Sequence, residues 1–582
     1  MLRASRASAA LIRSLILGTV AMTSTVAVSS VLVACGDENQ PEYWLDKLED
    51  PKWRPRAAQR LTLFLSDALT KADQNKEDPK VKALEDKLVG PLTDLYVKDY
   101  GSLDTATRVQ LIKLLADFRD PRTLPALKTA FEEFAKRPRK TTDESDIQWA
   151  VRAYADMKSP ELAPAVLKAF TKLEAHTPLG MAIYRDYSEA MVTAPSTGWG
   201  PELIELLGVE IKNPASAKSK EQQRDMVDPF RDQLFWQTTA AQILGELKDP
   251  SAVEPLLKVL YTPAKGDLAF TSLLALVKIG KPAVDRTIKV LDVKDSLAQF
   301  YLAELKKAGA TETPKGNPAV ATAAAVLGMA GRREAIPSLI AVLEGTIEDT
   351  DKALVARELT KIPSTPESEA AFKKAFESLP LETAVQGTPA LALLADAAAM
   401  FYDSTLVDWL LAQAKSVKGA GEEKTAVQQG LVVTALKLAK PEQWAQVSAA
   451  AHDLKMDDLV KGADAVVKAC GDKVDCYVQA VEKSENQEQA NQLAGIKAAY
   501  MVGVLGNAAA RDKVIEGLND IENGSIRAVL ARTIDFLTPK GDASVVEKLE
   551  AIIVKNRKSP DAAKSAGDGP VKEVAYRLAA RS

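Results

Sequence analysis

The chain has 582 residues, of which 46% are hydrophobic and 5% aromatic, and its formal net charge is −4. A single hydrophobic core stops growing near roughly 250–300 residues, so a chain of this length forms several domains or one elongated repeat. The mildly acidic balance argues against nucleic-acid binding, which needs a basic footprint, and against electrostatic adhesion to anionic lipid. Ala-rich windows of helical period predominate over period-two runs, which predicts an all-α protein.

The start of the chain has the layout of an export signal. Arg3, Arg6 and Arg13 are its only charges before a run without charge over residues 14–34, and small residues precede Cys35. The 21 residues of that run are also long enough to span a bilayer, so an uncleaved membrane anchor is the alternative. In either case the bulk of the chain is expected outside the cytoplasm and tethered to a membrane. Cleavage would leave 72 basic residues against 79 acidic ones, a net charge of about −7.

The string Leu-Val-Ala-Cys that ends at Cys35 resembles a bacterial lipobox. The resemblance implies cleavage before Cys35 and a thiol that carries diacylglycerol. More than one acyl chain on the new terminus would hold the protein stably at a membrane. Gly36, rather than Asp, follows the cysteine, and in enteric bacteria an Asp there favours the inner membrane. The resemblance therefore implies a lipid-anchored cell-envelope protein, with the outer membrane favoured.

One sequence pattern recurs along the rest of the chain: an apolar helix, a short turn that often contains Pro, and a second apolar helix. The clearest copies lie at residues 240–260 and 323–343, and looser ones at 111–131 and 151–170. Two helices cannot bury their apolar stripe alone, whereas stacked neighbours bury it continuously. We therefore expect the pairs to stack along the chain.

Individual positions in this pattern have predictable roles. Asp249 and Ser159 each precede a Pro and are expected to cap the second helix, with Pro in its first turn. Gly245 and Gly328 are expected to let two helices approach closely. The apolar residues of the best copy fall on one helical face: Leu244, Leu247, Val253, Leu256, Leu257 and Leu260.

This pattern resembles the HEAT repeat over about residues 100–545, whose period is roughly 40–47 residues. The resemblance implies an α-solenoid, a superhelix of HEAT-like helical hairpins that binds partners on a concave face. The spacing is irregular, because Asp120 and Ser159 are 39 residues apart while Ser159 and Asp249 are 90 apart. The longer interval must hold an extra helical pair or an insertion. A plain helical bundle is the alternative fold.

Three tryptophans are candidates for partner binding. Trp44 opens the folded part and either covers the end of the array or forms a docking surface near the membrane. Trp199 lies between two glycines in the irregular stretch 193–201, and Trp236 ends the aromatic-rich stretch 228–236. Trp is enriched in interface hot spots, but packing against the protein's own scaffold is the favoured interpretation for each of the three.

Cys470 and Cys476 remain once Cys35 is used for lipid. A close, even pair in an exported chain predicts a disulfide. The pattern predicts a helix over residues 457–469 that is capped by Gly471, with a second helix after the turn. The bridge would staple that turn and stabilise the fold by roughly 2 kcal/mol, and two free thiols are the alternative.

Residues for catalysis or metal binding are scarce. The chain has two histidines, His176 and His452, in loop-like or helix-end contexts, and no phosphate loop, zinc signature or hydrolase elbow. We therefore expect no catalytic residue, no metal and no cofactor.

These patterns favour a non-enzymatic scaffold that binds an envelope or membrane protein, sits at the membrane through its lipid and does not bind nucleic acid. A carrier for lipid, peptide or glycan is the alternative, and an enzyme or enzyme subunit is a third hypothesis that the few His and Cys residues disfavour. The predicted organisation is a signal peptide over 1–34, lipidated Cys35 with a tether over 35–42, the solenoid over 43–558, and a loop with a short helix over 559–582.

Overall fold

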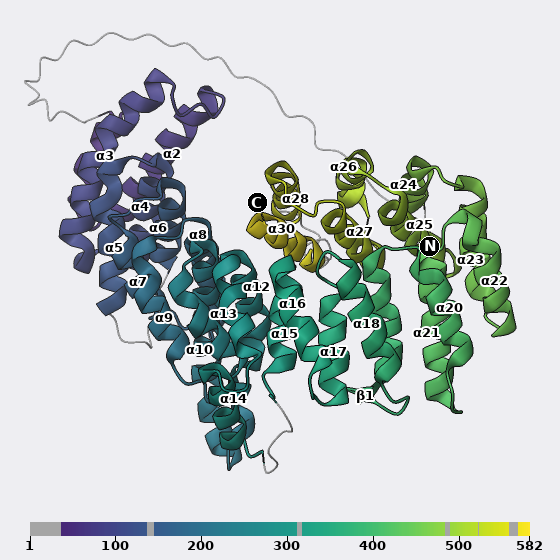
Figure 1. Ribbon diagram of the computed structural model, residues 1–582. Coiled ribbons are helices and arrows are strands. Elements are labelled where there is room, and N and C mark those ends of the chain that lie inside the picture. The colour runs from purple at the N-terminus through teal and green to yellow at the C-terminus, as the bar shows by residue number, and fades with distance from the viewer. Residues whose placement is uncertain are drawn as a thin grey trace, which may run out of the picture. The chain divides into compact units, whose positions relative to one another are not determined.

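The computed structural model describes residues 37–136, 145–310, 317–483, 489–521, 523–557 and 568–581. The predicted signal over 1–34 and the lipidation site Cys35 therefore lie outside the described residues. Within the described residues the chain is almost entirely helical, with one small antiparallel hairpin of β1 (Ala384–Val385) and β2 (Thr388–Pro389). The predicted all-α solenoid of helical hairpins is confirmed (Figure 1).

The chain divides into two compact units, with the boundary between Leu88 and Val89. The first unit contains α1 (Pro41–Lys47), α2 (Arg54–Lys71) and the start of α3 (Pro79–Asp99), the helix that crosses the boundary.

Trp44 lies in the core of this first unit. Its ring is 1% exposed, and its indole N–H donates to the Glu38 carbonyl at 2.8 Å. The guanidinium groups of Arg56 and Arg60 both lie 5.5 Å from its ring.

The second unit stacks helical pairs in two rows. Each helix of the first row contacts the next helix of that row, and most neighbouring helices of the second row also contact one another. The first row comprises α4 (Thr105–Phe118), α6 (Ser145–Met157), α8 (Pro178–Thr193), α10 (Lys220–Leu247), α12 (Ala269–Ile279), α15 (Val320–Ala330), α17 (Asp349–Leu359), α19 (Ala390–Ala397), α21 (Glu422–Leu438), α25 (Gln489–Leu505), α27 (Gly524–Phe536) and α30 (Gly569–Arg581).

The second row comprises α5 (Leu124–Lys136), α7 (Ala163–Phe170), α9 (Gly200–Gly208), α11 (Val253–Leu260), α13 (Lys281–Val290), α16 (Ile336–Glu344), α18 (Pro366–Ser378), α20 (Leu406–Ser416), α22 (Trp444–Asp453), α24 (Val474–Lys483), α26 (Ala508–Gly517) and α28 (Ala543–Arg557). Two further helices, α14 (Ser296–Lys307) and α23 (Asp457–Cys470), pack beside these rows.

Short 3-10 helices join many of the pairs: η1 (Tyr100–Ser102), η2 (Pro121–Thr123), η3 (Thr197–Trp199), η4 (Pro214–Ser216), η5 (Pro250–Ala252), η6 (Pro263–Leu268), η7 (Arg333–Ala335), η8 (Ala398–Phe401), η9 (Pro441–Gln443) and η11 (Leu518–Asp520).

The local chemistry of the best repeat copy follows the prediction in part, because Asp249 caps the 3-10 helix that leads into α11, while α11 itself has no side-chain cap. Asp249 caps η5, since its carboxylate accepts from the Ser251 amide at 2.9 Å. A Cβ placed on Gly245 would come within 2.8 Å of the Ala275 Cα, and one on Gly328 within 2.8 Å of the Glu358 carbonyl oxygen. Glycine is thus required at both places because the backbones of adjacent first-row helices approach each other closely.

The interval of 90 residues between Ser159 and Asp249 is predicted to hold either an extra helical pair or an insertion. The structure shows an extra helical pair. This pair is α8 and α9, and the first-row helix that follows, α10, is itself 28 residues long. The period is therefore irregular because element lengths vary, while the two-row arrangement continues.

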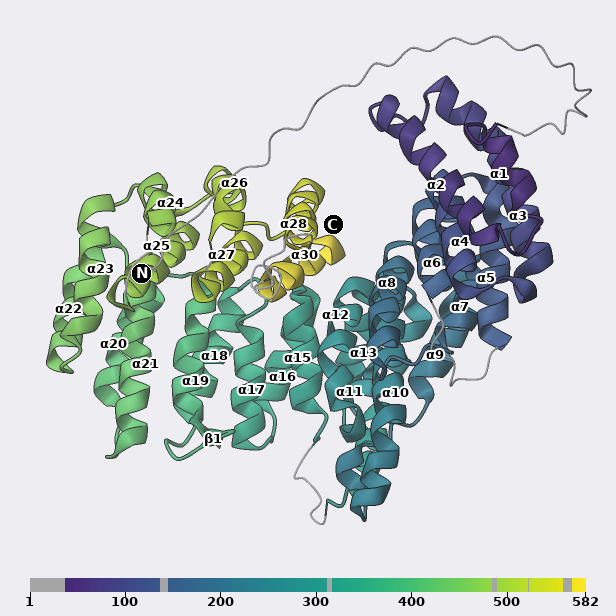
Figure 2. The same cartoon turned by 180° about the vertical axis from the view of Figure 1, so that it is seen from behind.

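From α12 onward the first row closes on itself. Each helix from α12 to α30 contacts the next of the row, and α30 contacts α12. Figures 1 and 2 both show α25, α27 and α30 beside α15, α17 and α21. The aromatic ring of Tyr402, just after α19, lies 5.4 Å from that of Tyr500 on α25 and 4.8 Å from that of Phe536 on α27. In this part of the solenoid the chain buries its own inner face.

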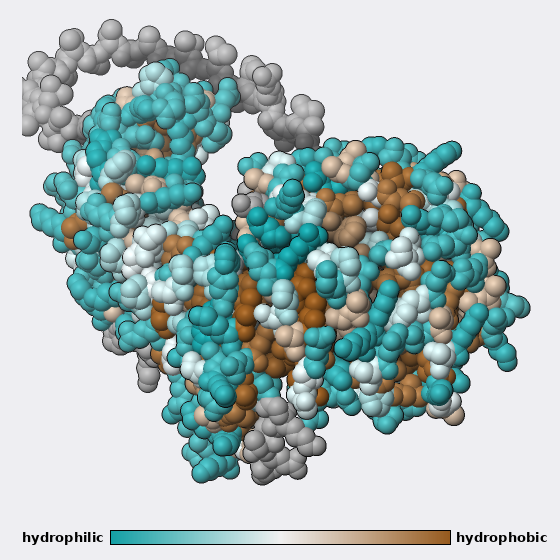
Figure 3. Space-filling view, viewed as in Figure 1, coloured by the Kyte–Doolittle hydropathy of each residue, from teal (hydrophilic) through white to brown (hydrophobic). Residues whose placement is uncertain are grey.

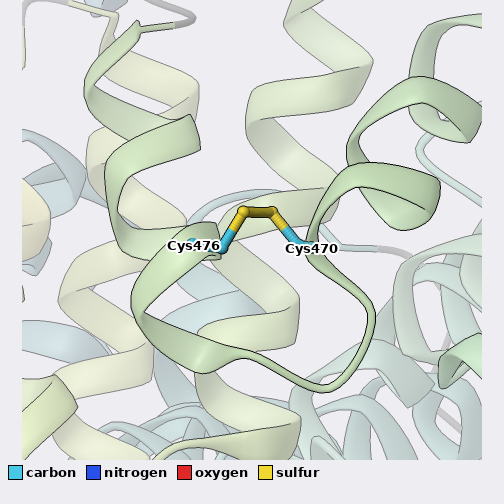
Figure 4. Close-up of a disulfide and its surroundings, with 2 residues drawn as sticks. All are labelled: Cys470 and Cys476. Atoms are coloured by element: carbon cyan, nitrogen blue, oxygen red, sulfur yellow. A yellow bond between two sulfur atoms is a disulfide. The ribbon is translucent and has the colours of Figure 1, made fainter.

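The predicted disulfide is present between Cys470 and Cys476, whose Cα atoms are 5.3 Å apart (Figure 4). It joins the end of α23 to the first turn of α24. Gly471 is the C-cap of α23, as the sequence predicts, and its φ of +52° is a conformation that favours glycine.

Candidate binding groove on the first row of helices

The three tryptophan candidates are all buried. Trp44, Trp199 and Trp236 are 1%, 2% and 4% exposed. The Trp199 indole N–H donates to the Ala163 carbonyl at 2.8 Å, which fixes the irregular stretch to α7. None of the three rings can meet a partner on the folded surface, which corrects the hypothesis that they form a partner-binding site and supports the packing interpretation.

The two histidines each pair with one carboxylate. The His176 Nδ1 lies 2.9 Å from an oxygen of Asp232, and the His452 Nδ1 lies 2.8 Å from an oxygen of Asp457. The hydrogen bond to Asp457 raises the pKa of His452 above its usual value. Across the described residues, no group of three or more His, Cys, Asp or Glu side chains could hold a metal ion.

The surface is instead hollowed where α8, α10, α12 and α30 meet. This hollow, the α8–α30 groove, has a volume of about 640 Å³. Figure 3 shows hydrophilic residues over most of the visible face, with hydrophobic strips over α12 and α15. The groove is lined by Tyr184, Arg185, Ser188, Glu189, Val192, Gln242, Glu246, Phe270, Thr271, Leu274, Ala275, Lys278, Gly569, Lys572 and Tyr576.

The apolar part of the groove comes from α8 and α12. Phe270, in the first turn of α12, is 56% exposed, whereas most large apolar side chains of the described chain are buried. Leu274 lies one turn further along the same helix, and Val192 faces the groove from α8. An exposed aromatic ring beside aliphatic side chains and inside a polar rim is typical of a protein-binding surface.

The rim of the groove is charged. Lys278 on α12 forms an ion pair with Glu246 on α10, and its ammonium lies 3.7 Å from the centre of the Tyr576 ring on α30. That residue thus joins three of the four walls and its charge is neutralised within the groove. The remaining charged rim residues are Arg185 and Glu189 on α8 and Lys572 on α30, which gives the rim a slight positive excess.

The α30 wall is held by a buried guanidinium. Arg577 has no exposed surface and donates to the carbonyls of Gly328 and Met329 at 2.9 and 3.0 Å. It also forms an ion pair of 2.9 Å with Asp535 on α27. Burial opposes ionisation of Asp535, but Arg577 and the nearby Arg581 outweigh it, so the pKa of Asp535 is lowered.

Glycine and a second arginine complete the attachment of α30. The Arg332 side chain donates to the Ala580 carbonyl at 2.7 Å. Gly280, with a φ of +78°, lies where an added Cβ would be 3.5 Å from the Ala580 Cβ. The end of α30 therefore rests on the turn between α12 and α13, and the groove wall is fixed in place.

None of the residues that line the groove would have been chosen from the sequence. They come from segments almost 400 positions apart, and each is unremarkable in its own helix. The one available signal was Phe270, an aromatic residue on the edge of an apolar helical stripe.

Comparison with known proteins supports the HEAT-like repeat. The family model for the PBS lyase HEAT-like repeat matches residues 236–262, which include the end of α10, η5 and α11. A crystal structure of importin beta in an ammonium sulfate condition aligns with 92% of this chain and 89% of its own, at 11% identity and a TM-score of 0.25. A homology model of the full-length AP-3 complex aligns over 92% and 93%, at the same identity and TM-score. Curated proteins give no significant match.

The class of protein that these observations define is an α-solenoid with HEAT-like helical repeats. Among the described residues, no helix combines the length and apolar character needed to cross a membrane.

Proposed function

We propose that this protein is a cell-envelope lipoprotein that acts as a non-catalytic scaffold and binds a segment of an envelope or membrane protein in the α8–α30 groove. The proposal rests on the exposed Phe270, which lies in a groove of about 640 Å³ on the first row of helices. Helical-repeat proteins use such inner surfaces to bind partners.

The closure of the first row narrows the choice of binding surface. From α12 to α30 the first-row helices pack against one another, so a partner has access to the first row at α4, α6, α8 and α10, and to the side of α12 that lines the groove. The groove lies at the end of this accessible stretch. Its rim favours a segment with an acidic residue near Arg185 and a large apolar side chain that packs on Phe270.

The membrane part of the proposal rests on the N-terminal sequence. In the proposed lipoprotein, the mature chain begins at Cys35, which carries diacylglycerol. Gly36 after it favours the outer membrane. Replacement of Cys35 by Ser should abolish incorporation of an alkyne-tagged fatty acid into the protein. Retention of the label in Cys35→Ser would overturn the lipidation.

The binding part is tested with full-length protein extracted from native envelopes in mild detergent after crosslinking. Phe270→Asp and Arg185→Glu should lose the captured partner. Val554→Asp is the matched control, since Val554 is a 46% exposed apolar residue on the second-row helix α28. Equal capture by the wild type, both groove variants and the control would contradict the proposed site.

A carrier role is the second candidate, and a specific observation favours it. A further cavity, of about 710 Å³, lies among second-row helices and contains a buried lysine.

A further inference from the structure

The second cavity lies among α9, α11, η6 and α14, and shares no lining residue with the α8–α30 groove. Its apolar walls include Ile204, Ile211, Val259 and Phe300. A volume of about 710 Å³ lies within the range of roughly 300–1,000 Å³ that is common for small-molecule sites. Ligand binding in this cavity therefore depends neither on the proposed partner groove nor on the lipid anchor.

Lys265 gives this cavity its chemistry. The side chain belongs to η6, lines the cavity and is 6% exposed. Its ammonium donates to the Leu207 carbonyl, which is its hydrogen-bond acceptor among the described residues. A lysine ammonium has three donors, so further donors remain for a ligand in the cavity.

No carboxylate of the described chain is paired with this ammonium. The acid that acts electrostatically on it is Glu304 on α14, which forms an ion pair with Lys307 of the same helix. Burial lowers the pKa of Lys265 to about 8, and Glu304 only partly opposes this effect. A buried cation without a counter-ion is unfavourable, and an anion bound beside it would remove that penalty.

The remaining charges of the cavity also favour an anion. Lys258 and Lys307 accompany Lys265, against Glu210 and Glu304, which leaves one positive charge in excess. The Lys258 ammonium lies 5.9 Å from the centre of the Phe300 ring, so a basic group and an apolar wall meet at the same place.

We propose that this cavity binds a long-chain carboxylate, with the carboxylate on the Lys265 ammonium and the alkyl chain against Ile204, Val259 and Phe300. The site combines one buried cation with apolar walls, and this is the recognition chemistry of a fatty-acid anion rather than of a neutral lipid or a peptide.

The test is a titration of purified full-length protein, in a non-ionic detergent, with dodecanoate labelled with ¹³C at the carboxyl carbon and followed by NMR. The wild type should bind dodecanoate saturably, with a shifted carboxyl resonance. Lys265→Met should weaken this binding about tenfold or more, as expected for loss of a hydrogen bond to a charged group, and leave dodecan-1-ol binding unchanged. The control Lys289→Met, an exposed lysine on α13, should bind as the wild type does.

A pH series on the wild type keeps the proposal falsifiable if the variant fails to fold. Dodecanoate affinity should fall as pH rises past about 8, because Lys265 loses its proton, while dodecan-1-ol affinity stays constant. The other ionisable groups that face the cavity are Lys258 on α11, Glu304 and Lys307 on α14, and Glu210 after α9. Equal affinity for acid and alcohol, or no loss above pH 8, would overturn the assignment.

Discussion

Arg577 donates to the carbonyl of Gly328 at 2.9 Å, across 249 positions of sequence. This bond and the ion pair with Asp535 fasten α30 to α15 and α27. These contacts close the first row from α12 to α30 and hold α30 in position as one wall of the α8–α30 groove.

Replacement of Arg577 by Ala should detach α30. Removing one partner of a buried ion pair leaves the other charge uncompensated, and such changes cost about 3–5 kcal/mol. We expect a loss of that size in the free energy of unfolding, with faster hydrogen exchange in α15 and α30. Arg224→Ala, at an exposed position of α10, is the control and should change stability by less than about 0.5 kcal/mol. Equal stability of the two variants would contradict the role of Arg577.

The same ion pair predicts a response to acid. The pKa of Asp535 is lowered in the folded state, so its contribution to stability is fully present above the unfolded pKa and is lost as pH falls through the folded pKa. The wild type should therefore exceed Asp535→Asn in stability at neutral pH, and the difference should shrink below about pH 4. Urea unfolding of both proteins across this pH range measures it. A difference that grows toward low pH would show that the carboxylate is not held ionised.

Close helix packing makes Gly245 sensitive to a single added carbon. Because a Cβ there would lie 2.8 Å from the Ala275 Cα, Gly245→Ala should destabilise the protein by about 1–3 kcal/mol. Gly524→Ala is the matched control, since no atom lies within 4 Å of the added Cβ at that helix start. Thermal unfolding compares them, and an unchanged or raised midpoint for Gly245→Ala would contradict the packing described.

Loss of the disulfide should be mild and local. Cys470→Ser and the double variant with Cys476→Ser should each lose roughly 2 kcal/mol, because the closed loop is short. Wild-type protein treated with a reductant provides the control and should match the variants. Stability unaffected by reduction would show that the bridge does not constrain the unfolded chain.

Features encoded within one repeat could be predicted from the sequence. Asp249 and Gly245 act within a helical pair or between neighbouring pairs, so their roles follow from local spacing. The position of Gly471 after α23 follows from the same kind of local rule.

Long-range features could not be predicted in this way. Closure by α30 depends on Arg577 meeting a carbonyl 249 positions away, and no periodicity encodes such a contact. Trp199 could be placed in an irregular stretch, but its burial depends on the Ala163 carbonyl of another helix. Lys265 stands two residues after Pro263 and directly before Gly266, so in sequence it resembles an ordinary exposed turn residue, and only the packing of α9 and α14 buries it.

The central claim is that a partner binds beside Phe270, and photo-crosslinking in native envelopes tests it most directly. A benzoylphenylalanine placed at position 270 of the full-length protein should give a discrete adduct with an envelope protein, and Arg185→Glu should weaken that adduct. The same group at position 554, on the second-row helix α28, should give no adduct. Absence of an adduct at 270, or identical products from both positions, would contradict the groove as the binding site.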